Sequence, residues 1–261
     1  MDATATLLDW AGDALVVRDD CEIVETELLA ADSFLVAAGR ALALGLHRER
    51  FAETAALQGF AHRAELDAFW EAGVALLPEE GRWFPRFELV RARGALRLRF
   101  RQRTAPPLGA DLVVATAASD PRRVPHLKGP DIDRLNALRQ RAQRDGAQEA
   151  VLLDEGRVTD GTTTALLWWR GETLCAPPFE LARVDSVSAR TVRGIAAALG
   201  VPVEEEAVRP AELEGTTLWA VNALHGIRDV TVWVDGPALG HEPARTAAWR
   251  ARCAALARPL R

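Results

Sequence analysis

One residue type in this chain stands alone. Lys128 is the single lysine among 32 lysine and arginine residues in a chain of 261. Lysine, unlike arginine, can lose its proton near neutral pH and attack a carbonyl carbon. A coding bias towards arginine accounts for the arginines but leaves the exception unexplained. Lys128 is therefore the first candidate for a covalent catalytic group, and the alternative is a solvent-exposed lysine beside the turn that follows it.

Histidine and cysteine show no pattern that would bind a metal. The five histidines have neither HxxxH nor HExxH spacing, and Cys21, Cys175 and Cys253 are far apart and odd in number. We therefore expect no metal site and no disulfide framework. Unpaired cysteines favour a reducing, cytoplasmic setting.

Charge and hydropathy exclude two further classes of partner. The net charge is −5 and the pI is about 5.6, and no basic stripe is present, so we expect no nucleic-acid partner. No apolar run approaches the roughly 18 residues of a membrane span. The stretch Met1–Asp13 has no basic region and does not resemble a signal peptide.

Hydrophobic periodicity predicts the elements that must position these residues. Helices are expected over 46–57, 64–77, 132–144, 188–199 and 242–256. Strands are expected over 14–17, 23–24, 34–36, 87–90, 96–100, 110–117, 150–153, 164–169, 173–176, 202–206, 217–222 and 230–234. The polar, proline-bearing stretch 119–125 marks a candidate domain junction. We predict an α+β fold with a small N-terminal α/β domain over 1–117 and a larger, β-rich C-terminal domain over 118–261.

Several short motifs follow one another in the order found in one enzyme family. Residues 47–51 match H-x-x-R-(L/F), and Lys128 precedes a predicted helix. Residues 158–165 correspond to an E-G-(S/T)-x-x-N stretch, with Asp160 in place of the glutamate. Residues 175–178, 186–190 and 222–224 correspond in order and spacing to T-P-P, G-(I/V)-T-R and N-(S/T/A)-L, with weaker agreement in the individual letters. On these motifs the chain resembles the class IV aminotransferases, the fold-type IV enzymes that use pyridoxal 5′-phosphate (PLP). That family includes branched-chain and D-amino-acid aminotransferases and aminodeoxychorismate lyases. The resemblance covers most of residues 30–240.

The resemblance implies how PLP is held by the C-terminal domain. Its aldehyde bonds to Lys128, which is then the base that moves the substrate proton. Its ring nitrogen needs a carboxylate to stay protonated, and Asp160 stands where the family has the longer glutamate. Val187 and Ser188, at the expected helix start, offer N–H groups to the phosphate, and Arg50 adds a guanidinium. The alternatives are a turn aspartate at 160, a plain N-cap at 188 and a solvated helix arginine at 50.

Asn222 and Ala223 complete the cofactor residues that the resemblance implies. The family often has a hydroxyl in the place of Ala223, so we expect Thr162 or Ser186 to substitute for it. His225, in the same loop, either faces the site or is a structural histidine.

The residues that would line the substrate pocket differ more from the family than the cofactor residues do. Ala189 replaces an arginine, residues 30–36 replace the family's Y-G-D-G and F-E-T letters, and the chain contains no tyrosine. Trp168, Trp169 and Trp219 are candidate pocket residues, and buried strands are their alternative use.

Three functions remain open on the sequence. The main prediction is a PLP-dependent aminotransferase that acts on an amino acid or small amine through Lys128. The alternative is a 4-amino-4-deoxychorismate lyase, which releases pyruvate and 4-aminobenzoate, and residues 167–169 and 222–224 lean towards it. A catalytically degenerate family member is the third. The resemblance also implies a homodimer with a small-molecule substrate.

Overall fold

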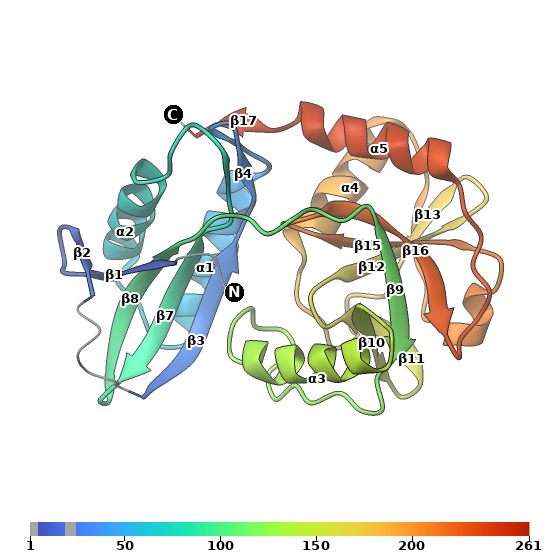
Figure 1. The fold of residues 1–261 in the computed structure, drawn as a ribbon, viewed down its shortest axis with the longest axis horizontal. Helices are drawn as coiled ribbons and strands as arrows, with labels where there is room; N and C mark the ends of the chain where they lie inside the picture. Colours follow the sequence, from blue (N-terminus) through green and yellow to red (C-terminus); the bar gives the residue numbers. More distant parts are fainter. Residues whose placement is uncertain (1–4, 19–24, 261) are drawn as a thin grey trace. The chain divides into compact units, whose positions relative to one another are not determined.

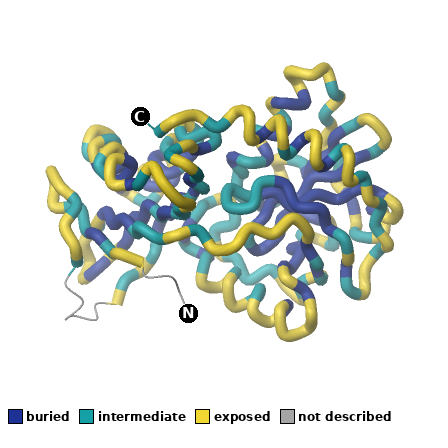
Figure 2. The backbone as a smooth tube through the Cα atoms, turned by 45° about the horizontal axis from the view of Figure 1, so that its top comes forward, coloured by how far each residue is buried: buried dark blue, intermediate teal, exposed yellow. Residues whose placement is uncertain are grey.

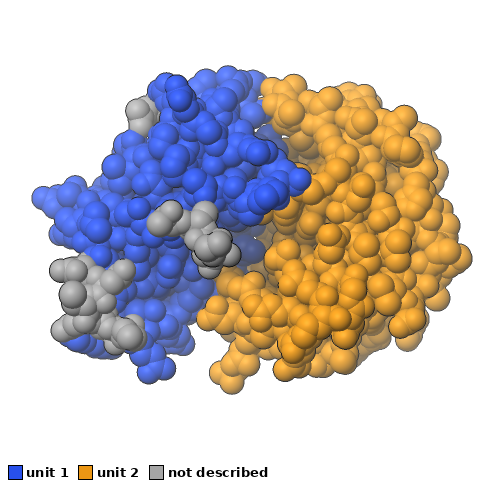
Figure 3. Space-filling model, viewed as in Figure 1, with its two compact units in different colours: residues 1–108, 127–130, 257–261 blue, residues 109–126, 131–256 orange. Residues whose placement is uncertain are grey.

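The computed structural model describes residues 5–18 and 25–260 (Figure 1). Cys21 and the strand expected at 23–24 lie outside these residues. The chain forms two compact units, unit 1 from residues 1–108, 127–130 and 257–261, and unit 2 from residues 109–126 and 131–256 (Figure 3). The expected boundary between 117 and 118 remains a prediction about domains. It differs from the units in three places. Residues 109–117 belong to unit 2, whereas residues 127–130, which include Lys128, and residues 257–261 belong to unit 1.

Unit 1 is built on an antiparallel sheet with the strand order β2-β1-β8-β7-β3. Its strands are β1 (Thr6–Trp10), β2 (Leu15–Val17), β3 (Thr26–Ser33), β7 (Arg86–Ala92) and β8 (Ala95–Gln102). Helices α1 (Leu44–Leu57) and α2 (Arg63–Ala75) pack against this sheet (Figure 1). The core between them is aromatic, with Phe51, Phe69, Trp70, Phe87 and Phe100 all nearly inaccessible to solvent.

Strands β7 and β8 sort their side chains cleanly by face, because successive residues of a strand point to opposite sides. Phe87 pairs with Phe100 across the two strands, and both belong to the aromatic core. Glu88 pairs with Arg99 in the next position and therefore lies on the other face of the sheet. The connecting turn has positive φ at Arg93 (49°) and Gly94 (81°), as a two-residue hairpin turn requires.

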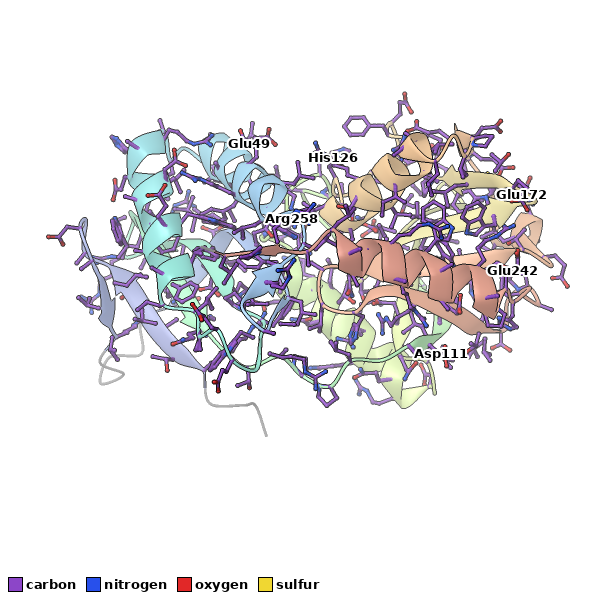
Figure 4. The ribbon with its side chains drawn as sticks, turned by 90° about the horizontal axis from the view of Figure 1, so that it is seen from above. Glu49, Asp111, His126, Glu172, Glu242 and Arg258 are labelled. Carbon is purple, nitrogen blue, oxygen red and sulfur yellow. The ribbon has the colours of Figure 1, made fainter. Side chains whose placement is uncertain are left out.

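A second, smaller sheet in unit 1 has the order β17-β5-β4-β6. Its strands are β4 (Val36–Ala37), β5 (Arg40–Ala41), β6 (Arg82–Trp83) and β17 (Arg258–Pro259), and Arg258 is labelled in Figure 4. The strand expected at 34–36 is therefore correct only at Val36, the first residue of β4. The long strand ends at Ser33 and the chain passes into the second sheet, while the ring of Phe34 packs against Trp70 and Phe87.

Unit 2 is built on an eight-stranded mixed sheet with the order β11-β10-β9-β16-β15-β12-β13-β14. Its strands are β9 (Asp111–Thr116), β10 (Glu149–Asp154), β11 (Arg157–Gly161), β12 (Ala165–Arg170), β13 (Thr173–Ala176), β14 (Val203–Glu205), β15 (Thr217–Asn222) and β16 (Gly226–Val234). The helices are α3 (Ile132–Arg144), α4 (Val187–Ala198), α5 (Pro243–Ala255) and a short 3₁₀ turn, η1 (Pro210–Leu213). Figure 2 shows the buried backbone concentrated in these strands. The predicted α+β class is confirmed.

The tryptophans of unit 2 belong to its core. Trp168 is fully buried, and its ring nitrogen donates to Glu206 at 2.9 Å. Trp169, Trp219 and Trp249 pack edge to face, with ring centroids 5.3–5.8 Å apart. These contacts fix α5 to the sheet and use the rings as packing groups.

Candidate active site

Lys128 is attached to the edge of the unit 1 sheet through its backbone. The amide of Ala31, on edge strand β3, donates to the carbonyl oxygen of Lys128 at 2.8 Å. The next residue, Gly129, has φ +140° and lies so close that a Cβ there would sit 2.6 Å from the nitrogen of Ala31. Only glycine permits this approach. The contact explains why residues 127–130 group with unit 1 although the chain on either side belongs to unit 2.

Arg50 is held by a buried carboxylate on the same strand. Asp32, fully buried on β3, accepts from Nε and Nη2 of Arg50 at 2.7 and 2.9 Å, and from Nδ1 of His47 at 2.7 Å. Burial by itself raises the pKa of Asp32, but the charges of Arg50 and His47 and their hydrogen bonds outweigh it and hold the pKa well below its usual value. The guanidinium of Arg50 thus has a fixed orientation on α1.

Asp160 is a buried residue near the end of β11. A terminal guanidinium nitrogen of Arg122 lies 3.6 Å from its carboxylate. Arg122 is itself fixed, because it pairs with both oxygens of Asp120 and donates to the carbonyl of Ala182 at 2.7 Å. Arg122 thus holds the buried carboxylate of Asp160 in place, and it is this carboxylate that suits a protonated ring nitrogen.

A second buried carboxylate accepts hydrogen bonds from the hydroxyl groups that follow Asp160 in the sequence. Glu149, on β10, has no solvent exposure and accepts from the hydroxyl groups of Thr162 and Thr163. Each hydroxyl proton is therefore used inside unit 2. Thr162 can still accept a hydrogen bond but has no proton left for a phosphate oxygen.

Helix α4 begins one residue earlier than its expected cap. Ser186, in extended conformation, is the N-cap, and its hydroxyl accepts from the amide of Ala189 at 3.3 Å. The expectation that Ser188 caps the helix is wrong, because the chain is already helical at Val187. The amides of Val187 and Ser188 are in the first turn, where no intrahelical acceptor exists, so they can hold an anion.

Asn222 organises the turn between β15 and β16. Its side-chain oxygen accepts from the amides of Leu224 and His225, and its nitrogen donates to the carbonyl of Thr163 at 3.3 Å. This last bond joins the turn that contains Ala223 to the segment after Asp160. The ring of His225 accepts from the amide of Gly109 at 3.1 Å and is thereby tied to the fold.

The structure thus groups the candidate residues within each unit. In unit 1, Arg50 and the backbone of Lys128 both attach to neighbouring residues of β3. In unit 2, Asn222 is bonded to the segment after Asp160. Sequence reasoning missed Asp32, Arg122 and Glu149 as partners. The buried position of Asp32 in an apolar run was a usable signal, whereas nothing in the loop 119–125 marks Arg122.

Neither a metal site nor a membrane span is found in the described residues. No group of three or more His, Cys, Asp or Glu side chains there could hold a metal ion. No described helix combines the length and the apolarity needed to cross a membrane.

Comparison with known proteins identifies the family. The profile of the amino-transferase class IV family matches residues 29–233, and the chain belongs to this family. Its fold is similar to that of a fold IV-transaminase from Curtobacterium pusillum, with 21% identity, a TM-score of 0.80 and coverage of 95% of this chain and 97% of that one. A PLP-bound hypothetical aminotransferase from Mycobacterium tuberculosis is similar with 16% identity, a TM-score of 0.78 and coverage of 97% and 98%. A candidate 4-amino-4-deoxychorismate lyase from Legionella pneumophila is similar with 15% identity, a TM-score of 0.74 and coverage of 88% and 92%. A search of curated proteins finds no match.

Membership of this family confirms the predicted dependence on PLP. The residues present fit the cofactor by their chemistry. Asp160 is a buried carboxylate for the ring nitrogen, the first turn of α4 offers amides for the phosphate, and Lys128 is the only side-chain amine in the chain. The hydroxyl expected from Thr162 is committed to Glu149, so the backbone amides carry more of the phosphate binding.

Proposed function

We propose that the protein is an aminotransferase that moves an amino group between a small amine or amino acid and a keto acid, with Lys128 as the covalent attachment point of PLP. The observation that carries this proposal is the position of Lys128. The backbone of Lys128, whose side chain carries the only side-chain amine of the sequence, is attached to a sheet edge by a hydrogen bond, and the next residue lies so close to β3 that only glycine fits there. A surface lysine in a loop would need neither constraint.

The proposal assigns one task to each of the other residues. Asp160 holds the ring nitrogen in its protonated form, and Arg122 fixes the carboxylate in place. The amides of Val187 and Ser188 bind phosphate oxygens, and Arg50 adds a guanidinium that Asp32 orients. When bound, PLP supplies an electron-withdrawing ring that stabilises negative charge at the substrate carbon. Lys128 accepts and returns the proton at that carbon.

Asn222 and Ala223 have a supporting role in the proposal. The three hydrogen bonds of Asn222 fix the turn in which Ala223 stands, and two of them use the amides of Leu224 and His225. The amide of Ala223 is then the group of this turn that replaces the missing hydroxyl at the phosphate.

A lyase is the second candidate, and the Asn222-Ala223-Leu224 turn favours it. The fold is also similar to that of the Legionella candidate lyase. A single pair of assays separates the two functions. Incubation with amino-acid donors and a keto acid should yield a new amino acid and a new keto acid if the protein is an aminotransferase. Incubation with aminodeoxychorismate should release 4-aminobenzoate and pyruvate if it is a lyase.

We also propose that the enzyme works in the cytoplasm as a homodimer. The cysteines Cys175 and Cys253 are buried free thiols, which is consistent with a reducing compartment. Family membership supports the dimer, and light scattering of the purified protein tests it.

A further inference from the structure

A buried carboxylate closes the loop that contains Lys128. Asp131 is only 4% exposed, and one of its oxygens, Oδ2, accepts from the amides of Arg123 and Val124 at 2.9 Å each. The chain leaves this oxygen at Val124 and returns to it at Asp131, so the carboxylate joins the two ends of the loop 124–131. We call this pair of hydrogen bonds the Asp131 clamp.

The place of Asp131 in the fold makes this use of its side chain informative. Asp131 directly precedes α3, where the side chain of an aspartate ordinarily accepts from an amide of the first helical turn. In the described chain, no amide of α3 makes such a bond with this side chain. The backbone carbonyl of Asp131 does serve the helix, since it accepts from the amide of Leu135 at 2.9 Å. The carboxylate is therefore committed to the loop before the helix.

The chain between the clamp and Lys128 is short and stiff. Only Gly129 and Pro130 separate Lys128 from Asp131. The ring of Pro130 fixes its φ. Gly129 lies against β3, where a Cβ would be 2.6 Å from the nitrogen of Ala31. A change of direction at Asp131 is therefore passed on to the backbone of Lys128, because the two residues between them have little freedom to absorb it.

The chain on the other side of the clamp is also fixed. Arg122, which precedes the clamp directly, pairs with Asp120 and donates to the carbonyl of Ala182 at 2.7 Å. Its guanidinium lies 3.6 Å from the carboxylate of Asp160. Along the sequence, the Asp131 clamp thus joins the segment that fixes the proposed partner of the ring nitrogen to the loop that contains the lysine.

We infer that Asp131 is a positioning residue for Lys128. Its carboxylate fixes the direction in which the loop presents the lysine, so that the amine reaches the aldehyde carbon of PLP without a search by a mobile loop. The amine adds to that carbon, a C=N bond forms and the aldehyde oxygen leaves as water. Asp131 takes no part in this step and acts through the amides of Arg123 and Val124. The inference rests on the attachment of PLP to Lys128 in the proposed function.

The test follows the reaction of the full-length, PLP-free protein with PLP by stopped-flow absorbance. Asp131→Ala removes the oxygen that accepts from both amides, and we expect the rate constant for bond formation to fall about tenfold or more. Asp131→Asn keeps one carbonyl oxygen, which can accept from both amides, and should restore a rate close to that of the wild type. Asp133→Ala is the matched control and should react as the wild type does, because Asp133 is an exposed acid in the first turn of the same helix.

A second measurement separates positioning from a loss of structure. Pyridoxamine 5′-phosphate has the ring and the phosphate of PLP but no aldehyde, so it binds without a bond to Lys128. We expect its Kd, measured by calorimetry, to be the same for the wild type and Asp131→Ala, whereas a residue that only supported the binding site would raise this Kd when removed. If Asp131→Ala does not fold, Asp131→Glu takes its place, since it keeps the charge, moves the oxygens by one methylene group and should slow the reaction in the same sense.

The outcomes distinguish this inference from the proposed function. The inference is refuted, and the aminotransferase function retained, if the variant without the clamp reacts with PLP as fast as Asp133→Ala, if Asp131→Asn restores nothing, or if pyridoxamine 5′-phosphate binding is lost as well. If the reaction is slowed and then restored by Asp131→Asn while the wild type transfers no amino group, the inference is supported and the proposed function is refuted. A wild type that does not react with PLP refutes both.

Discussion

The Asp32 network offers the sharpest test of the energetics in unit 1. Asp32 is fully buried and accepts three charge-assisted hydrogen bonds, at 2.7, 2.7 and 2.9 Å. Asp32→Asn keeps the shape and one oxygen but removes the charge. Arg50, with 13% of its side chain exposed, is then left as a nearly buried cation. Breaking a buried ion pair from one side costs about 3–5 kcal/mol, and the partial exposure of Arg50 places the expected loss near 3 kcal/mol.

The pH dependence of this loss has a definite sign. The pKa of Asp32 in the folded chain lies below its ordinary value of 3.8, because the charges of Arg50 and His47 outweigh the opposing effect of burial. The stabilisation is therefore complete above about pH 4 and disappears as pH falls below it. The difference in unfolding free energy between wild type and Asp32→Asn should be about 3 kcal/mol at pH 5 and should shrink as the pH falls below 4.

Urea unfolding monitored by tryptophan fluorescence measures the difference. Glu49→Gln is the matched control, because Glu49 lies on α1 (Figure 4) and its ion pair with Arg63 leaves both side chains 50% exposed. An exposed pair of this kind contributes about 0.5 kcal/mol. The reasoning fails if Asp32→Asn costs no more than Glu49→Gln, or if its cost grows as the solution is acidified below pH 4.

Three further predictions concern the candidate site. Asp160→Ala should weaken PLP binding about tenfold or more in equilibrium dialysis, whereas Asp160→Glu should retain it, because only the second variant keeps a carboxylate. Gly129→Ala should cost about 2 kcal/mol or more in urea unfolding, since its Cβ would lie 2.6 Å from the nitrogen of Ala31. Gly146→Ala, at φ +85° with no neighbour within 4 Å, should cost only about 1 kcal/mol. Burial, and secondly the charge of Arg228, lower the pKa of His225 from 6.5 to about 4. The unfolding free energy of the wild type should therefore fall as the pH is lowered from 6.5 to 4, and that of His225→Gln should fall less.

Local patterns in the sequence predict most of the regular elements. The helix at 132–144 and the strands at 173–176 and 217–222 have the bounds that periodicity assigns to them. The two strands are short runs buried on both faces, and the helix has apolar residues at helical spacing, so both kinds of pattern are visible in a short window. The strand expected at 34–36 is correct only at Val36 for a long-range reason, since β3 is defined by its pairing with β7 and Phe34 by its packing against Trp70.

The contacts of the candidate site residues are harder to predict from the sequence, because the residues that contact them are distant along the chain. Motif spacing picks out Lys128, Arg50 and Asp160, but it cannot show that Asp32 orients Arg50 or that Arg122 faces Asp160. Each of these contacts depends on how strands and loops are brought together. Nothing in the residues next to Arg122 in its polar loop indicates that Asp160 is its partner.

The attachment of PLP to Lys128 is the claim on which the account depends. The purified protein is incubated with PLP, treated with borohydride to make the bond irreversible, digested and mapped by mass spectrometry. The account predicts one labelled peptide, which contains Lys128, and no labelled peptide in Lys128→Arg, a variant that keeps the charge but cannot form the bond. A wild-type protein that takes up no label, or a Lys128→Arg variant labelled to the same extent, would contradict it.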